Sequence, residues 1–436
     1  MIVSFSFKNF RSIKEEQSFS LEATSSKLKI NNIFCPTEKK SKLRLLKTVG
    51  LYGSNASGKS NLIRLMWTMR NFILSSTDLK TGDQIPETIY DPYFLDGNSK
   101  NQPTEFTIEF FGFNKKKHKY SIKYNKSEII YEYLGVYESS RISKIFERID
   151  SNEFVEFGDG MLNKKEEKKV PQNQLYLSKI GNSPNEQFKD IYLYFKLMEI
   201  WNAVPSTVKD TLFRRTETIF KNIKNESLIK KINKLISVAD TKISRVEVTE
   251  KGNEGFSALP KEIRASMINK YKFETFGIHP VFENNNQIGE ERFSFNTQES
   301  QGTRMMFAIG GLMLEVFERS TPSVIFLDEF DNSLHPDLAK FLIELFHNPK
   351  VNKNNSQLVF ATHETTLLDK NIFRKDQIWF GEKNKFGETE FFSIKDFKDL
   401  NNVRSDIPFD KWYRTGKFGA VPNIRKFEFI AEYEQD

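Results

Sequence analysis

Hydrophobic and polar residues alternate with the two-residue period of β-strands over much of the first half of the chain. Residues 1–25 predict two short strands joined by a turn at residues 9–14. Residues 160–175 are polar and rich in Lys and Glu, which predicts a mobile loop. Further alternating segments predict strands at residues 105–113, 119–124, 128–138, 142–148 and 153–157. Together these strands predict an antiparallel β-lobe.

The three- to four-residue period of helices dominates the middle of the chain. Between residues 184 and 240, apolar residues recur at three- and four-residue steps, which predicts amphipathic helices. Residues 209–242 carry nine Lys or Arg against four Asp or Glu. A solvated helix face and a contact with nucleic acid explain this basic surface about equally well. Strands at 244–249, 272–276 and 292–295 are expected to lead into a strong helix that starts at Gln301.

Uninterrupted apolar runs are typical of strands that are buried on both faces of a parallel sheet. Such runs occupy residues 45–52, 324–327, 357–361 and 377–380, and helical patterns at 61–72 and 337–346 lie between them. This alternation predicts an α/β fold with a mixed, largely parallel core sheet. Residues 115–290 separate the first of these strands from the later ones. We therefore expect them to form an insertion, which includes the β-lobe and a mainly helical arm.

The composition is that of a soluble globular protein with two or three domains. The chain has 436 residues, of which 38% are hydrophobic and 28% charged, and its net charge is +7. A single cysteine, Cys35, excludes an internal disulfide and fits a reducing cytosol. The N-terminus lacks the blocks of a signal peptide, and the longest apolar run, 305–314, is shorter than the roughly 18 residues that span a membrane. We expect a cytoplasmic protein without a membrane partner.

The segment Gly53–Ser60, with the sequence GSNASGKS, joins an apolar strand to a helix and matches the Walker A pattern G-x-x-x-x-G-K-S. Backbone N–H groups and the helix dipole would bind a triphosphate there. Lys59 would reach the β- and γ-phosphates, and the Ser60 hydroxyl would ligate Mg²⁺. An ordinary Gly/Ser surface loop is the alternative. The predicted nucleotide-binding residues of this segment are Gly53, Ser54, Asn55, Ala56, Ser57, Gly58, Lys59, Ser60 and Asn61.

Two acidic residues follow the apolar strand at 324–327. Ligands of parallel sheets lie at the carboxyl ends of the strands, and that is where Asp328 and Glu329 are expected. Asp328 would support the Mg²⁺ shell, and Glu329 would orient and deprotonate the attacking water. Apolar strands that end in two acids also arise by chance, so this signal depends on its place after a complete Walker A motif.

The apolar strand at 357–361 has the same design, because it ends in Thr362 and His363. A neutral histidine at this place can donate a hydrogen bond to a γ-phosphate oxygen or to the attacking water. A lone histidine at a strand end is more often structural. The order of the three motifs along the chain favours the functional role.

Residues 298–304 immediately precede the helix that starts at Gln301. Ser300 is a good N-cap, and Gly302 leaves backbone amides uncovered at the start of the helix. Simple capping is one explanation. The other is a second anion site, and since one Walker A loop needs no second site, Ser300 and Gly302 would serve the γ-phosphate bound by another subunit.

The ordered set GSNASGKS, SQGT, VIFLDE, DNSLHP and ATHE resembles the ABC-type ATPase heads of SMC, RecF and RecN proteins. It is more similar still to the OLD-like and RloA/AbiL-type ATPases of prokaryotic defence operons. The turn at Asn9–Ser12 fits, because such heads begin with a strand and an N-F-R/K-S turn near the nucleotide. Residues 414–422, RTGKFGAVP, resemble a tail of the RloA-type branch.

The resemblance implies a role for each matching residue. Lys59, Glu329 and His363 would be catalytic, and Arg11 would lie at the nucleotide. Ser300 and Gly302 would act across a homodimer that sandwiches ATP between its heads. Asp331 would report the state of the partner's site. The implied cofactors are ATP and Mg²⁺, with Ser60 and Asp328 at the metal.

The resemblance also implies how the chain is divided. An ABC-type P-loop ATPase head would consist of residues 1–114 and 291–436. The antiparallel β-lobe would occupy residues 115–180. The helical arm and its return to the head would occupy residues 181–290. No motif covers the insertion at 115–290.

Two positions depart from the family pattern. The transporter signature Leu-Ser-Gly-Gly-Gln is here Glu-Ser-Gln-Gly-Thr, which keeps only the Ser and the second Gly. No clear glutamine marks the loop that senses the nucleotide. Gln84 lies in a polar stretch, and residues 91–94 fit the end of a strand better.

These motifs can be compared with three classes of function. The first is a dimerising ATPase whose closure moves the inserted arm and acts on nucleic acid or on an effector from the same operon, such as a nuclease or toxin. The second is an ATP-gated scaffold with slow hydrolysis that holds such an effector. A DNA-repair or recombination ATPase of RecF or RecN type is a further alternative. A transporter subunit fits poorly, because those chains lack the long insertion. No nuclease motif is recognisable in the chain, so an effector would act in trans.

Overall fold

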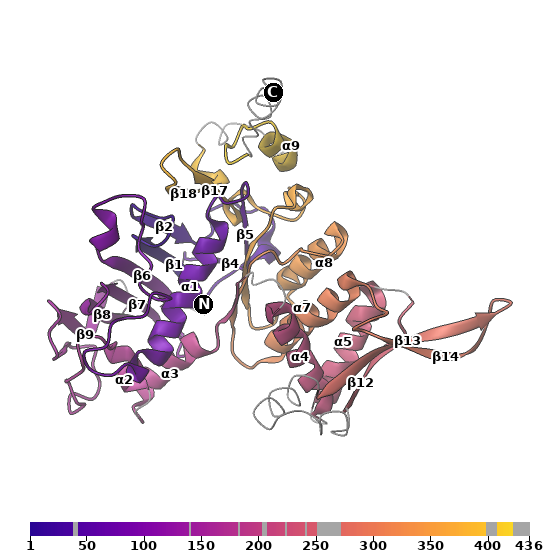
Figure 1. Ribbon diagram of the computed structural model, residues 1–436, viewed down its shortest axis with the longest axis horizontal. Helices are drawn as coiled ribbons and strands as arrows, with labels where there is room; N and C mark the ends of the chain where they lie inside the picture. The colour runs from indigo at the N-terminus through magenta and orange to yellow at the C-terminus, as the bar shows by residue number, and fades with distance from the viewer. Residues whose placement is uncertain are drawn as a thin grey trace, which may run out of the picture. The chain divides into compact units, whose positions relative to one another are not determined.

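The computed structural model divides the chain into two compact units (Figure 1). Unit 1 comprises Met1–Asn202, Thr321–Glu329 and Ile343–Asp436, and unit 2 comprises Ala203–Ser320 and Phe330–Leu342. The structure describes residues 1–37, 42–138, 141–181, 184–202, 207–222, 225–239, 242–250, 272–397 and 408–421. Residues 251–271 of the predicted arm and Pro422 of the tail lie outside this set. The domain boundaries predicted at residues 114, 180 and 290 remain predictions.

A six-stranded sheet forms the centre of unit 1. Its strand order is β11-β15-β16-β5-β17-β18, and every neighbouring pair is parallel except β17 with β18. The strands are β11 (Glu199–Trp201), β15 (Val324–Leu327), β16 (Gln357–Ala361), β5 (Thr48–Tyr52), β17 (Ile378–Lys383) and β18 (Thr389–Ser393). All residues of β5, β15 and β16 are buried, as their uninterrupted apolar sequences predict. The predicted α/β class with a largely parallel core sheet is confirmed.

The second sheet of unit 1 has seven antiparallel strands in the order β10-β9-β8-β7-β6-β1-β2. The strands are β1 (Ile2–Lys8), β2 (Gln17–Ser20), β6 (Thr104–Phe111), β7 (Lys117–Tyr124), β8 (Ile129–Glu138), β9 (Arg141–Ile149) and β10 (Glu156–Phe157). Buried and half-buried residues alternate along most of β6 and β7, which is the pattern that predicted them. The antiparallel lobe is confirmed, and it includes the N-terminal hairpin. A separate pair, β3 (Ile33–Phe34) with β4 (Leu45–Leu46), precedes β5.

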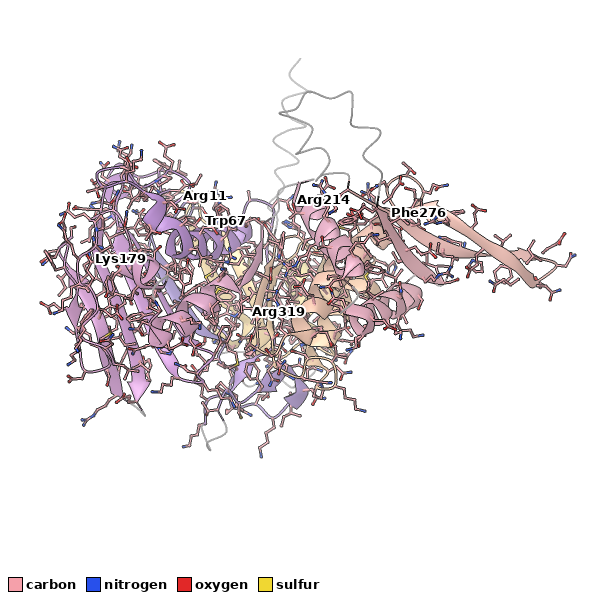
Figure 2. All side chains as sticks on the ribbon, turned by 90° about the horizontal axis from the view of Figure 1, so that it is seen from below. Arg11, Trp67, Lys179, Arg214, Phe276 and Arg319 are labelled. Carbon is pink, nitrogen blue, oxygen red and sulfur yellow. The ribbon has the colours of Figure 1, made fainter. Side chains whose placement is uncertain are left out.

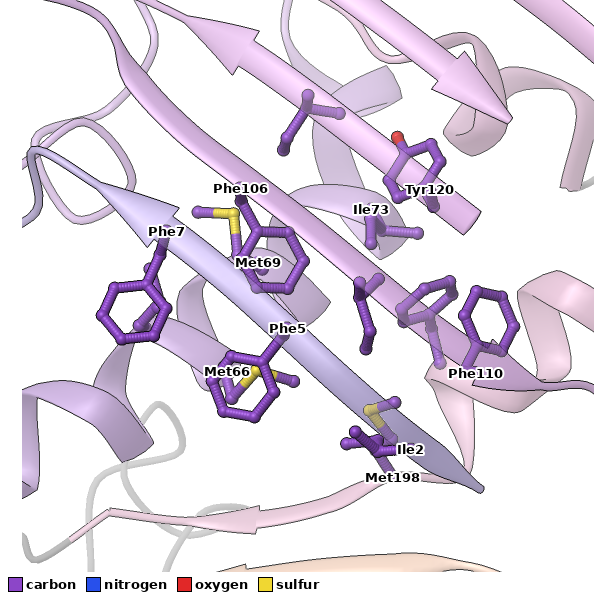
Figure 3. Packing of buried hydrophobic residues seen from close by; sticks show 14 of the residues in the cluster. Ile2, Phe5, Phe7, Met66, Met69, Ile73, Phe106, Phe110, Tyr120 and Met198 are labelled. Atoms are coloured by element: carbon purple, nitrogen blue, oxygen red, sulfur yellow. The ribbon is translucent and has the colours of Figure 1, made fainter. Parts of the chain in front are cut away.

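Helix α1 (Lys59–Ser75) packs its apolar residues into one core shared with both sheets of unit 1. Figure 3 shows Met66, Met69 and Ile73 of this helix among phenylalanines of β1 and β6. The rings of Phe5 and Phe326, one from each sheet, lie 6.5 Å apart between centroids. The dense aromatic packing of this core therefore accounts for many of the chain's phenylalanines. Other α-helices in the described part of unit 1 are α2 (Tyr176–Gly181), α3 (Glu186–Lys196) and α9 (Phe409–Arg414). Helix α8 (Pro336–His347) contains the boundary between the units.

Unit 2 contains the predicted helices together with an antiparallel sheet. Among the described residues of this unit, helices are formed by α4 (Thr207–Lys221), α5 (Glu226–Ala239) and α7 (Gln301–Glu318). Arg215 of α4 makes a two-bond ion pair with Glu315 of α7 at 2.7 and 2.9 Å, and Lys231 of α5 pairs with Glu318. Part of the basic surface predicted at residues 209–242 is therefore neutralised by acidic residues of α7.

The sheet of unit 2 is larger than the sequence predicted. Strands β12 (Arg245–Glu250), β13 (Phe273–Glu283) and β14 (Asn286–Ser294) pair in that order. The last two extend as a ribbon beyond the helices of this unit, with Phe276 near its base (Figures 1 and 2). Most of β14 is exposed, so its residues show no alternation of apolar and polar side chains from which its length could be predicted.

Two other expectations about elements were wrong. Residues 91–94 were predicted at the end of a strand, but they belong to none of the strands in the part of the chain that is described. Strand β11 lies inside the segment predicted as helical. It was not predicted, because three residues are too few to show a period. Among the helices whose residues are described, none combines the length and the apolar character needed to cross a bilayer.

Candidate functional site

The loop at residues 53–58 leaves the central strand β5 and ends at the start of α1. Gly58 is the N-cap of α1 with φ +100°, and Gly53 has φ +145°, so both occupy conformations that disfavour other residues. The Lys59 side chain is only 4% exposed. Its ammonium donates to the carbonyl oxygens of Gly53 at 2.9 Å and Ser54 at 2.8 Å. The charge of Lys59 is therefore held along the concave side of the loop.

The two glycines of this loop are also required by protein contacts. A Cβ atom on Gly53 would lie 2.4 Å from the carbonyl oxygen of Gly381 in β17. A Cβ atom on Gly58 would lie 2.3 Å from Oγ1 of Thr389 in β18. The hairpin β17–β18 thus packs directly on the loop. The fold therefore needs glycine at both positions for the approach of the C-terminal hairpin, apart from any ligand.

Asp328 and Glu329 follow β15, two strands from β5 in the core sheet. The Asp328 N–H group donates to the carbonyl oxygen of Trp201 at 3.0 Å, which continues the ladder between β15 and β11. Glu329 has φ +47°, a left-handed conformation that costs a residue other than glycine about 1 to 3 kcal/mol. Such strain persists where the surrounding structure enforces it, and it is frequent at functional sites.

His363 lies beyond the end of β16, which is the strand between β5 and β15. Its Nδ1 atom is 3.3 Å from the Lys59 ammonium nitrogen. Partial burial, followed by the Lys59 charge, lowers the pKa of His363, while the Glu329 carboxylate and a hydrogen bond with the Gly53 backbone oppose this shift. The imidazole is therefore held neutral between a cation and an anion. Lys59, Glu329 and His363 converge at the carboxyl edge of the parallel sheet, where the sequence placed them.

Arg11 and Asn61 are joined by hydrogen bonds at the start of α1. The Arg11 guanidinium donates to Asn61 Oδ1 at 3.2 Å, and the Asn61 amide donates to Ser12 Oγ at 2.6 Å. Arg11, which is labelled in Figure 2, also pairs with Asp91 at 2.9 Å. Burial raises the pKa of Asp91, although the Arg11 charge opposes this. No motif predicts this contact, because Asp91 lies in a turn-rich segment. Gln84, which was weighed for the nucleotide-sensing loop, is exposed.

Ser300, Gly302 and Asp331 belong to unit 2, whereas the phosphate-binding loop belongs to unit 1. Ser300 is the N-cap of α7, and its Oγ accepts a hydrogen bond from the Thr303 N–H at 3.1 Å. A Cβ atom on Gly302 would lie 3.0 Å from the Ser333 carbonyl oxygen. The start of α7 and the loop after Glu329 are therefore adjacent within unit 2. The predicted cap is confirmed, and its role in anion binding remains a prediction.

Mg²⁺ prefers oxygen ligands and usually takes only one or two from the protein, with the remainder from phosphates and water. The hydroxyl of Ser60, exposed in the first turn of α1, and the carboxylate of Asp328 at the end of β15 have this chemistry. No group of three or more His, Cys, Asp or Glu side chains with the geometry of a metal site is found among the described residues. These residues fit a metal bound mainly by a nucleotide.

The chain is similar to several solved structures and to one family of known domains. Solved structures with similarity include an SMC head bound to the C-winged helix domain of ScpA, at 12% identity and TM-score 0.46 over 92% of this chain and 99% of that one. The SMC head domain from Thermotoga maritima has 12% identity and TM-score 0.41, covering 90% and 98%. The recombination mediator RecF with ATP has 14% identity and TM-score 0.35, covering 84% and 94%. A comparison with curated proteins found no match.

A family of known domains matches most of the chain, in two overlapping segments at residues 49–164 and 153–369. The matched range contains the phosphate-binding loop, the acidic pair after β15 and His363. The chain therefore belongs to the family described as "AAA domain, putative AbiEii toxin, Type IV TA system".

Proposed function

We propose that this protein binds ATP with Mg²⁺ and hydrolyses it. The observation that carries the proposal is the convergence of Lys59, Glu329 and His363, in which Lys59 Nζ lies 3.3 Å from His363 Nδ1 and Glu329 follows the strand next to the one that His363 follows. A cation, a carboxylate and an imidazole beside a phosphate-binding loop are groups that can promote phosphoryl transfer to water.

Each group has a role that its surroundings support. The ammonium of Lys59 would stabilise charge on the β- and γ-phosphates. The Glu329 carboxylate would accept a proton as the oxygen of water attacks the γ-phosphorus and the bond to the β–γ bridging oxygen breaks, which yields ADP and phosphate. His363, kept neutral, would donate its N–H proton in a hydrogen bond to a γ-phosphate oxygen. Ser60 and Asp328 would hold Mg²⁺, which neutralises phosphate charge when bound.

We extend this proposal to a composite site formed by two copies of the chain. Ser300 and Gly302 expose the N-terminus of α7, an 18-residue helix whose dipole favours an anion. Asp331 lies in the loop next to this helix start. In a homodimer closed on ATP, these residues of one subunit would face the γ-phosphate bound at Lys59 of the other. Hydrolysis would then open the dimer and change its conformation.

The experiment that tests this function uses Glu329→Gln. The amide keeps the shape of the side chain but cannot accept the proton, so hydrolysis is expected to fall by about 10² to 10⁴. ATP binding should persist, and the variant should accumulate as an ATP-dependent dimer in light scattering. Lys59→Ala should lose binding and dimerisation together. Hydrolysis by Glu329→Gln at the wild-type rate would show that Glu329 is not the base.

We further propose that this switch acts in defence against phage. The family description names a toxin and a type IV toxin–antitoxin system, and the ordered motifs resemble those of RloA/AbiL-type ATPases. The protein would sense nucleic acid or a phage component and control a separate effector, such as a nuclease or toxin. Proteins that co-purify with and without ATP identify the effector, and turnover with and without DNA tests the sensor. Slow turnover that DNA does not stimulate, with a stable effector complex, would instead indicate an ATP-gated scaffold.

A further inference from the structure

The segment at residues 408–421 lies against the phosphate-binding loop of unit 1. Helix α9 is followed by a tight turn in which Gly416, Gly419 and Ala420 have φ of +74°, +70° and +57°. This turn directs the Ala420 carbonyl oxygen at the loop. The oxygen accepts two hydrogen bonds of 3.0 Å, one from the Ser54 N–H group and one from the Tyr413 hydroxyl.

Aromatic packing holds this segment in place. Phe418 is 1% exposed, and its ring centroid lies 5.4 Å from that of Phe380 in β17. The ring of Tyr413 stacks on the same Phe380 with 5.3 Å between centroids and 6° between planes. Ala420 N–H donates to Glu382 Oε1 at 3.1 Å. Ala420 is thus oriented by Tyr413, which stacks on β17, and by Glu382, which belongs to β17, the strand beside β5.

The phosphate-binding loop is held by the adjacent Lys59, whose ammonium donates to the Gly53 and Ser54 carbonyl oxygens at 2.9 and 2.8 Å, and by contacts from the C-terminal part of the chain. Within the loop, the Ser57 N–H reaches the Ser54 carbonyl at 3.3 Å, which is long for such a bond. Two hydrogen bonds from outside the loop are shorter than this one. The Ala420 carbonyl accepts from the Ser54 N–H at 3.0 Å, and Thr389 Oγ1 donates to the Ser57 carbonyl at 3.1 Å. In addition to Lys59, two residues that follow the loop by more than 300 positions in the chain therefore hold it at Ser54 and Ser57.

We propose that residues 408–421 form a clamp that positions the phosphate-binding loop and thereby sets its affinity for ATP. Tyr413 and Ala420 are the positioning residues, and neither supplies a group to the phosphates. A loop restrained in one conformation loses less entropy on binding, and apparent affinity falls with the fraction of molecules in the competent conformation. The inference rests on the proposed ATP binding and adds a determinant of that binding outside the sequence motifs.

Tyr413→Phe tests the clamp most directly, because it keeps the stacked ring and removes only the hydroxyl. The loss of one neutral hydrogen bond is expected to weaken binding of a fluorescent ATP analogue by about fivefold. The KM for ATP should rise by a similar factor, with kcat little changed. Phe418→Leu removes the anchor ring and should weaken binding further. Lys411→Ala, at an exposed position of the same helix, is the matched control and should bind like the wild type.

Hydrogen exchange separates positioning from general stability. In Tyr413→Phe, amides of residues 53–58 should exchange faster, while those of buried β16 keep the wild-type rate. Equal exchange at the loop and unchanged affinity would overturn the clamp. Equal loss of protection throughout unit 1 would also overturn it, since Tyr413 would then support only the fold. If the wild type itself fails to bind the analogue, the proposed ATP-binding function fails instead, so the two outcomes are distinct.

Discussion

His347 offers a quantitative test of how the strand before the phosphate-binding loop is held. The imidazole ends α8 and is 8% exposed, and its Nε2 atom lies 2.7 Å from Oγ1 of Thr48, the first residue of β5. Gln377 donates to the same Thr48 hydroxyl at 2.7 Å, and the hydroxyl can donate its own proton to the imidazole. With that direction of the bond, Nε2 is the unprotonated nitrogen of a neutral imidazole.

The magnitude follows from the pKa. Burial, together with the smaller effect of the Lys47 and Lys29 charges, lowers the pKa of His347 to about 3. The ordinary pKa of about 6.5 applies to the unfolded chain. Between these values the unfolded state binds the proton and the folded state does not, so stability is full above pH 6.5 and falls as the pH decreases toward 3. At pH 5 the loss is on the order of 2 kcal/mol.

The assay is urea unfolding of the wild type and of His347→Gln between pH 5 and 7.5. Glutamine can accept the Thr48 bond but does not titrate, so the variant should lose about 2 kcal/mol of the pH dependence whatever its stability at pH 7.5. His335→Gln, at an exposed histidine, is the matched control. Parallel stability curves for the wild type and His347→Gln would refute the reasoning, because they would mean that His347 binds its proton equally in both states.

Three further predictions concern stability and the predicted signature. Gly58→Ala should lower the free energy of unfolding by about 2 to 4 kcal/mol, since the new Cβ atom would clash with Thr389 at a positive φ. Gly82→Ala, at φ +90° with no atom within 4 Å, should show only the smaller loss due to backbone strain, and thermal unfolding of both variants compares the two losses. Arg374→Met should lower the free energy of unfolding in urea by about 3 to 5 kcal/mol, because it leaves the Asp376 carboxylate, 1% exposed, without the guanidinium 2.7 Å away. Recovery of stability by Asp376→Asn in the same chain would confirm the cause, and a single variant as stable as the wild type would contradict it. Ser300→Ala should lose about 1 kcal/mol of stability as the cap of α7 is removed, with Ser300→Thr as the control; if its ATP turnover falls no more than that of Ser300→Thr, Ser300 is only a cap.

The sequence was sufficient to predict those elements whose physical cause lies within a few consecutive residues. The strands β15 and β16 were predicted with their observed bounds, because fully buried strands are uninterrupted apolar runs. The cap at Ser300 was predicted because capping depends on residues within one turn. Strand β11 and the length of the ribbon β13–β14 were not predicted, since three residues show no period and an exposed ribbon shows no apolar face.

The candidate site shows the same division. The spacing of the motifs identified Lys59, Glu329 and His363 individually, and the carboxyl edge of a parallel sheet was enough to expect them together. Asp91 beside Arg11 and Thr389 against Gly58 were not foreseeable. Neither contact involves a motif, and each joins residues far apart in the chain.

The sequence by itself determined the fold class, the phosphate-binding loop and the order of its companion motifs, because these depend on residue type and on short spacing. Only the tertiary structure decided what holds the loop in shape. Ala420 and Thr389 approach it from the other end of the chain, and their hydrogen bonds exist only after β17 has paired with β5. A backbone carbonyl has the same chemistry in every residue, so no pattern of side chains could mark Ala420 as the partner of Ser54.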